Sequence, residues 1–145
     1  MHPSIQILFS EMASCNKQFP TAQLPPNCFV LMKPEYLEYE SRTMLKISFP
    51  VEKEYLNPMK VMQGGFITAA FDNVIGPLSY LAARNLCTSM DIHTNYIRSV
   101  AAGDILTITA RVVSRGGNAM HLSAEAVNSK GRLVATCSAN MIVMK

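Results

Sequence analysis

The chain has 145 residues, of which 49% are hydrophobic and 16% charged, and its formal net charge is +3. A chain of this length forms about one domain and buries roughly 68–70% of its unfolded surface, enough for an independent core. Its lysines and arginines are scattered singly, without the basic runs or aromatic platforms that nucleic-acid-binding proteins use. We therefore expect one domain over residues 1–145 and no nucleic acid partner. The low share of charged residues favours extra burial between subunits.

The cysteine pattern argues against a disulfide framework and against a metal site. Cys15, Cys28, Cys87 and Cys137 are irregularly spaced, with no Cys-x-x-Cys pair and no histidine at zinc-ligand spacing. Reduced thiols of this kind indicate a cytoplasmic setting. The first ten residues lack the basic region and long apolar core of a signal peptide, and we find no run of about 18 apolar residues to span a membrane.

The first 19 residues are expected to contain a helix that packs on the outside of the domain. Ser4 is a candidate N-cap for this helix. Apolar residues follow it at helical spacing: Ile5, Leu8, Phe9, Met12 and Phe19. Three prolines then break the pattern, so that residues 20–28 are predicted to be a connector.

From about residue 29 the pattern changes to short apolar or alternating runs. Candidate strands lie near 29–33, 36–40 and 43–51, and after a long helix further strands are expected at 87–99, 104–114, 119–128 and 132–144. Three short turn signals separate the last four runs, which predicts that each is an antiparallel neighbour of the next. The result is an α+β fold with a curved antiparallel sheet and one long helix across a face.

The helix predicted at about 64–84 has two different faces. An apolar stripe is expected against the sheet: Ile67, Phe71, Val74, Ile75, Leu78, Leu81 and Ala82. Asp72 lies off this stripe, in a line of small and polar residues formed with Gly65, Thr68, Gly76 and Ser79. This line either leaves room for a ligand or allows close packing at a subunit interface.

The residues that begin this helix are suited to acyl chemistry. Gly64 and Gly65 allow a ligand to approach the backbone, and a helix N-terminus offers unpaired N–H groups to a developing oxyanion. Asp72 is ionised at neutral pH and can act as a general base or as a nucleophile. Residue types alone do not separate these two routes.

The segment from Asn57 to Asp72 resembles the signature of the hotdog-fold acyl-CoA thioesterases of the phenylacetic-acid-degradation type. That signature is an Asn, a His-Gly-Gly, an Asp on the following helix and a Ser on the next strand, and the resemblance covers roughly residues 42–145. Asn57, Gly64, Gly65, Asp72 and Ser89 match it. Gln63 departs from it, because the family most often has His there and an amide carries no proton in the physiological range. The resemblance implies a sheet wrapped around a central helix, here with an extra N-terminal helix.

The resemblance also implies roles for the matched residues. The Gly64 or Gly65 N–H would bind the thioester carbonyl, Asn57 would orient the thioester or a water, and Ser89 would bond to the attacking water or to Asp72. Gln63 and Thr68 are the neighbouring substrate-contact candidates. The sequence alone also allows Asn57 to be a turn residue before Pro58.

The expected substrate is an acyl-CoA, with coenzyme A as part of the substrate and no separate cofactor. Arg98 and Arg115, with Lys130 and Arg132, lie near strand ends where they could meet the phosphates of coenzyme A or form solvated surface charge. Strand alternation places Ser89 on one face with Asp91, His93 and Asn95. We assign no role to His93 or Asp91.

Helix geometry predicts that two chains share the site. Eight residues separate Gly64 from Asp72 by about 12 Å, whereas a reacting carbonyl must lie about 3 Å from both its oxyanion donor and its attacking group. An antiparallel pair of such helices about a two-fold axis closes this gap. The resemblance implies the same arrangement, in a homodimer whose pairing into a homotetramer is left open.

Two alternatives to hydrolysis follow from the same residues. A hydratase or dehydratase on this fold needs a His paired with an acid, and residues 57–79 contain no His. A non-catalytic acyl-ligand binding protein would keep the pocket without turnover.

Overall fold

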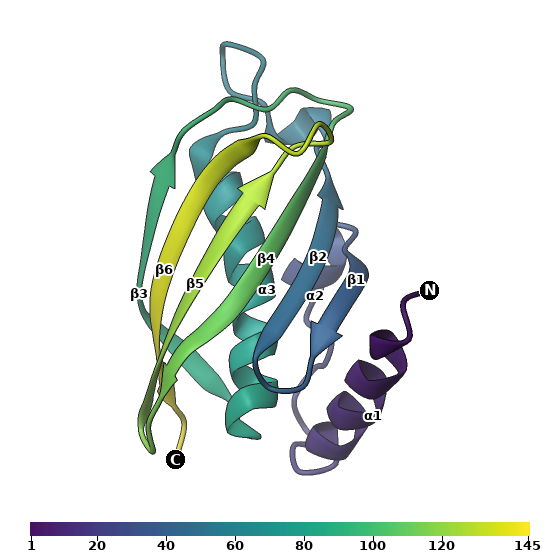
Figure 1. The fold of residues 1–145 in the computed structure, drawn as a ribbon, viewed down its shortest axis with the longest axis vertical. Helices are drawn as coiled ribbons and strands as arrows, with labels where there is room; N and C mark the ends of the chain where they lie inside the picture. The colour runs from purple at the N-terminus through teal and green to yellow at the C-terminus, as the bar shows by residue number, and fades with distance from the viewer.

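A six-stranded antiparallel sheet curves around one long helix in the computed structural model, which describes residues 1–145 (Figure 1). The helices are α1 (Ser4–Asn16), α2 (Asn27–Leu31) and α3 (Gly64–Ala83), with a short 3-10 turn at Lys53–Tyr55. The strands are β1 (Glu35–Glu40), β2 (Met44–Pro50), β3 (Cys87–Tyr96), β4 (Ile105–Arg115), β5 (Ala119–Val127) and β6 (Leu133–Val143). The expected α+β hotdog fold is confirmed.

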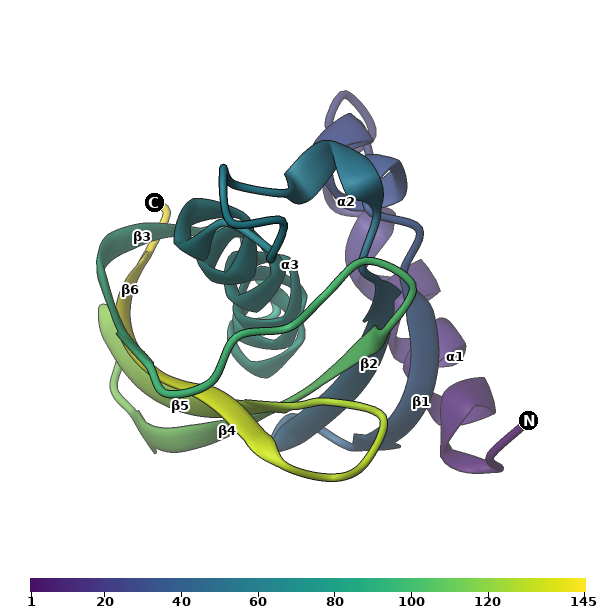
Figure 2. The same cartoon turned by 90° about the horizontal axis from the view of Figure 1, so that it is seen from above.

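α3 lies in the concave side of the sheet, as the view from above shows (Figure 2). Every residue of the predicted apolar stripe is buried there. Strand side chains that alternate inward on β4, β5 and β6 complete the core. α3 has the length and hydropathy of a membrane span, a feature that the sequence reading did not find, but most of its apolar side chains are enclosed by the sheet.

The strand order differs from the predicted one at a single place. The sheet runs β1-β2-β4-β5-β6-β3, so that β4, β5 and β6 are antiparallel neighbours as predicted, whereas β3 pairs with β6 and not with β4. The turn signal near Ala101 therefore marks a connection that crosses the end of the sheet (Figure 1). Wrapping the sheet around α3 separates two strands that are close in sequence.

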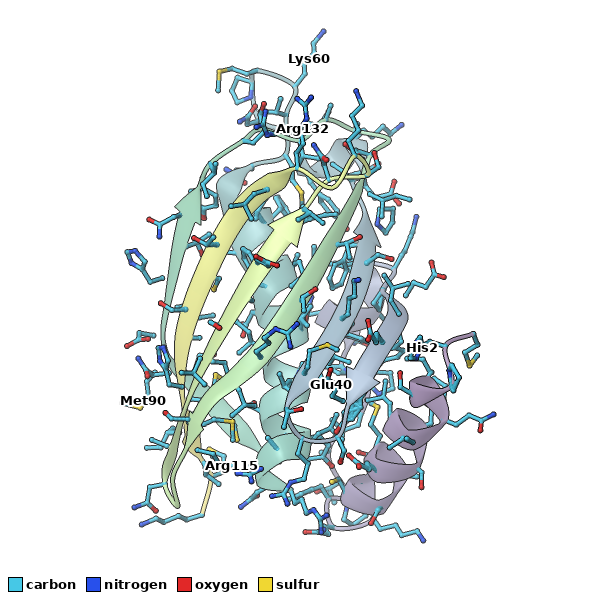
Figure 3. The ribbon with its side chains drawn as sticks, in the orientation of Figure 1. His2, Glu40, Lys60, Met90, Arg115 and Arg132 are labelled. Atoms are coloured by element: carbon cyan, nitrogen blue, oxygen red, sulfur yellow. The ribbon has the colours of Figure 1, made fainter.

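β3 is an edge strand with a bulge beside its start. Ser89 pairs with Met141 and Asp91 with Asn140, which leaves Met90 as the extra residue. The bulge reverses the alternation, so Ser89 faces α3 while Asp91 bonds to Asn140 on the outer face. The prediction that Ser89 and Asp91 share one face is therefore wrong. Met90 projects from this edge and is 61% exposed (Figure 3).

The N-terminal segment packs outside the sheet, as expected, and is held by side-chain hydrogen bonds. α1 lies along β1 (Figure 2). Ser4 does not cap α1; its hydroxyl accepts a hydrogen bond from the Tyr39 N–H of β1. Tyr39 in turn donates to Glu11. No strand forms at 29–33: residues 29–31 end the short helix α2, which follows the extended Pro26.

The C-terminal end of α3 is closed by arginines from the sheet. The Ala82 carbonyl accepts hydrogen bonds from Arg42, at 2.7 Å and 3.1 Å, and from Arg115, at 3.1 Å. Cations at this end of a helix also interact favourably with its dipole. Helix α3 is thus anchored to the β1–β2 and β4–β5 hairpins at the end away from Gly64.

Candidate active site

The N-terminus of α3 presents two backbone donors that the chain leaves unpaired. Gln63 is the N-cap residue, and its carbonyl accepts hydrogen bonds from Phe66 and Ile67. The Gly64 and Gly65 N–H groups precede the first helical acceptors and have no partner within the chain. The exposed Gln63 side chain makes no capping bond. This end of α3 therefore offers donors to a ligand oxygen.

The loop before α3 is organised by Asn57. Its side-chain oxygen accepts hydrogen bonds from the N–H groups of Met59, at 2.9 Å, and Val61, at 3.3 Å. The Asn57 backbone N–H donates to the Val61 carbonyl at 2.8 Å, which closes the loop. This is the turn geometry that the residue before Pro58 allowed, and it leaves the side-chain NH₂ group without a partner within the chain.

A polar cluster joins the first turn of α3 to the end of β3. The Tyr96 hydroxyl donates to the Gly64 carbonyl at 2.9 Å and lies 2.6 Å from the Thr68 hydroxyl. Thr68 also lies 2.9 Å from the Thr94 hydroxyl. Thr68 is thus already engaged, and Tyr96 is a site residue that sequence reasoning missed. The β3 bulge decides on which face of the sheet the Tyr96 side chain lies, and no turn residue in the sequence indicates that bulge.

Asp72 and Ser89 meet at the middle of α3. The Ser89 hydroxyl donates to the Asp72 carboxylate at 3.3 Å and also lies 3.4 Å from the Met141 sulfur. Burial raises the pKa of Asp72, while the bond from Ser89 lowers it. Asp72 is exposed to solvent, although enough protein packs near its carboxylate for burial to raise the pKa.

Asp72 also lines a largely apolar cleft of about 260 Å³. The walls come from α3, from the start of β3 and from the N-terminal segment, including the connector around Leu24 and Pro26. No group of three or more His, Cys, Asp or Glu side chains that could hold a metal ion is present. The contribution of the N-terminal segment was not foreseen from the sequence.

The other residues in the predicted line of small and polar residues on α3 are less exposed than their spacing indicated. Ser79 is fully buried, and its hydroxyl donates to the Gly76 carbonyl at 2.7 Å, so it does not face a ligand. Gly65 and Asp72 are exposed, whereas Gly76 lines the cleft. The open part of this face therefore runs from Gly65 to Gly76.

The basic candidates divide between the two ends of the molecule. Arg98 is exposed in the segment after β3, and its N–H donates to the Val134 carbonyl beside the α3 N-terminal end. Lys60 and Arg132 lie at that end and Arg115 at the other (Figure 3). The Arg115 side chain already has a partner in the Ala82 carbonyl, so its position needs no ligand phosphate to explain it.

Comparison with known proteins identifies the family and the fold. The family model of the thioesterase superfamily matches residues 59–135, which include Gly64, Gly65, Asp72 and Ser89. The chain belongs to the thioesterase superfamily. No curated protein matches the sequence significantly.

Solved structures place this superfamily member among PaaI-like hotdog folds. PaaI from the phenylacetic acid degradation operon of E. coli superposes with a TM-score of 0.81 at 16% identity, over 95% of this chain and 94% of that chain. A phenylacetic acid degradation-related protein from Ralstonia eutropha gives 0.76 at 23% identity, over 89% and 98%. A Streptococcus mutans protein bound to acetyl CoA gives 0.74 at 21% identity, over 86% and 94%.

Proposed function

We propose that this protein hydrolyses acyl-CoA thioesters to a carboxylic acid and free coenzyme A, in a cytoplasmic setting. The observation that carries the proposal is the Asp72 carboxylate, which accepts a hydrogen bond from Ser89 and belongs to a residue that lines an apolar cleft. Membership of the thioesterase superfamily supports the reaction class. The acetyl CoA in the similar Streptococcus mutans structure supports the choice of thiol carrier.

In the proposed reaction the free N–H of Gly64, with that of Gly65, binds the thioester carbonyl oxygen. Negative charge grows on this oxygen during attack, and each preorganised donor of this type contributes about 3–4 kcal/mol in other enzymes. Asp72 either takes a proton from the attacking water or attacks the carbonyl carbon itself. In both routes the carbon–sulfur bond breaks and the coenzyme A thiolate leaves and is protonated. In the second route the acyl group remains on Asp72 as an anhydride, which water then hydrolyses to free the carboxylic acid and restore the carboxylate.

The Gly64 donor and the Asp72 carboxylate are proposed to come from two subunits. Both residues lie on one continuous helix, where eight residues rise about 12 Å. β3 is an edge strand beside this face of α3, and an edge strand exposes unpaired backbone groups that a second strand can bind. Antiparallel pairing of two β3 edges would extend the sheet and bring the two α3 helices together in a homodimer.

The decisive experiment is thiol release from a panel of acyl-CoA substrates by the parent protein and by Asp72→Asn. We expect the variant to lose at least about a hundredfold in rate, because the neutral amide neither accepts a proton nor attacks. Asp91→Asn is the matched control, since Asp91 bonds to Asn140 on the outer face of the sheet and should retain the parent rate. Equal rates for parent and Asp72→Asn would remove Asp72 from the mechanism.

Absence of turnover by the parent would favour the non-catalytic binding protein. One feature makes this a real alternative: the exposed Gln63 stands where the family most often has His, and its side chain has no partner. A hydratase has less support. The acid–histidine pair that it needs is missing, because His121 bonds to Asn140 on the outer face and His93 alternates away from α3.

A further inference from the structure

We propose that the cleft beside Asp72 is the acyl-binding pocket and that Gly76 sets the length of acyl group that it accepts. This inference rests on the proposed thioester hydrolysis and names its substrate class: acyl groups of medium length or with one aromatic ring. The N-terminal segment and α3 together would form the walls of this pocket.

The chemistry of the lining selects an uncharged, apolar group. Asp72 alone among the lining residues carries a formal charge, and it is the proposed base or nucleophile. Side chains such as Met12, Leu24 and Phe29 supply apolar surface. A bound thioester would place its acyl group against this surface, while the carboxylate product, once formed, would be repelled by Asp72.

The walls of the cleft are held to α3 by hydrogen bonds at two places. The Asn73 amide donates to the Cys28 carbonyl at 3.1 Å, which ties α2 to α3. The Tyr80 hydroxyl donates to the Asn16 side chain at 2.9 Å, which ties the end of α1 to the same helix. The pocket is therefore formed before any ligand binds, as is usual for small-molecule sites.

The volume limits the size of the ligand. An apolar cavity of about 150 Å³ accepts benzene in another protein, so the 260 Å³ present here suffices for a phenyl ring with a short linker or for a chain of similar size. Each methylene that enters the pocket should raise kcat/KM about fourfold, up to the length at which the pocket is full.

Gly76 is the position at which this depth can be changed. A Cβ atom built on Gly76 meets no atom within 4 Å other than those of its chain neighbours and of the nearby α3 backbone, and Gly76 lines the cleft, so a side chain there would extend into the cleft. Gly76 lies inside α3 directly before Pro77, whose ring disfavours the helical conformation of a preceding residue that carries a Cβ atom, although leucine is otherwise a better helix former than glycine. Gly76→Leu should shorten the pocket, and its circular dichroism spectrum checks that the fold is retained.

The test measures kcat/KM for CoA thioesters from acetyl to dodecanoyl and for phenylacetyl-CoA. Gly76→Leu should lower the ratio of kcat/KM for medium-length and phenylacetyl substrates to that for acetyl-CoA by at least about tenfold. Met12→Ala, which removes a wall side chain, should move the preference to longer chains. Ala13→Leu, which introduces the same side chain on the exposed face of α1, is the control and should leave the chain-length profile unchanged. An unchanged chain-length profile in both pocket variants would overturn the inference.

Binding of S-hexyl-coenzyme A and S-ethyl-coenzyme A, two thioethers that cannot be hydrolysed, separates this inference from the proposed reaction. Calorimetry should show tighter binding of the hexyl than of the ethyl compound, and Gly76→Leu should abolish the difference. If the thioethers bind in this way but the protein hydrolyses no thioester, the acyl pocket is supported and the proposed reaction is rejected. Hydrolysis with no effect of tail length on thioether binding would reject the pocket and retain the reaction.

Discussion

Gly64 combines a free N–H group with a close approach to an aromatic ring. A Cβ at this position would lie 2.9 Å from the Tyr96 ring, whose hydroxyl donates to the Gly64 carbonyl. Replacing Gly64 therefore has two separable effects, one on packing against Tyr96 and one on the donor. Alanine and proline distinguish them, because both introduce the Cβ atom and only proline removes the N–H.

We predict that Gly64→Pro loses about a hundredfold or more in kcat relative to Gly64→Ala, the effect of removing one oxyanion donor. Gln63 already has the extended backbone, with ψ of 140°, that a following proline requires, and proline is favoured at the first helical position. Steady-state kinetics of the two variants gives the ratio. Similar kcat values for both would show that the Gly64 N–H does not bind the oxyanion.

Protonation of Asp72 should set the pH below which activity is lost, called here the acid limit. This pH should depend on the hydrogen bond from Ser89. The reactive form is the carboxylate, so kcat/KM falls as the pH drops through the pKa of Asp72, which burial raises above its ordinary value. Ser89→Ala removes a bond that favours the carboxylate and should move this limit to higher pH. A pH–rate profile whose acid limit stays in place in Ser89→Ala would contradict the assignment.

The raised pKa of Asp72 should also make the stability of the folded protein depend on pH. The folded protein binds the Asp72 proton more tightly than the unfolded chain does, so the contribution of this group is fully present below the unfolded pKa and is lost as the pH rises through the folded pKa. Asp72→Asn should therefore have a higher Tm than the parent at pH 7, and the difference should shrink on acidification. Thermal unfolding from pH 3 to 7 measures this, and a Tm below that of the parent at pH 7 would refute it.

At the scale of elements, the two ends of α3 differ in what surrounds them. The C-terminal end is closed by arginines that bond to the Ala82 carbonyl, and the N-terminal end keeps its first donors free. One end is therefore suited to anchoring the helix and the other to binding a ligand. Arg98 lies at the ligand-binding end and Arg115 at the anchoring end, so only Arg98 is expected to contact the phosphates of coenzyme A.

We expect Arg115→Ala to lower the free energy of unfolding by about 0.5–1 kcal/mol, because a hydrogen bond at the helix end is lost while Arg42 still donates to the same carbonyl. Arg98→Ala should instead raise KM for acyl-CoA about two- to fivefold, an effect that added salt weakens. Urea unfolding and kinetics at two ionic strengths distinguish the variants. An increase in KM confined to Arg115→Ala would place the phosphates at the opposite end.

At the scale of the whole molecule, a site shared between chains predicts complementation. Homodimers of Asp72→Asn lack the carboxylate at both sites, and homodimers of Gly64→Pro lack the donor at both. A mixed dimer of the two would combine one intact Gly64 and one intact Asp72 at a single site. Unfolding and refolding an equal mixture should therefore restore about a quarter of the parent rate per chain, since half of the dimers are mixed and have one complete site.

A refolded mixture that remains as inactive as the separate variants would place both groups in one chain. Size-exclusion chromatography of each variant is the control, because loss of the dimer would also prevent complementation. Asp91→Asn mixed with Gly64→Pro should show simple averaging of the two rates, since Asp91 lies on the outer face.

Much of the fold follows from patterns within short stretches. The apolar stripe of α3 repeats at helical spacing and is buried as predicted, and the strands from β4 to β6 alternate as their pattern indicated. The Gly-Gly pair marked the start of α3, and Asp72 was located on its accessible face. Such features depend on neighbours within a few residues, which a sequence records directly.

The tertiary structure decided the features that depend on distant residues. Sheet closure around α3 places β3 beside β6, and the bulge at Met90 turns Ser89 toward Asp72 and Asp91 away from it. The cleft brings the N-terminal segment against α3 across more than forty residues of chain. Residue periodicity determined which side chains are buried and where the reactive groups lie along the chain. Long-range pairing decided which of them meet, because the energy of a contact between distant segments depends on the whole packed core and leaves no local pattern.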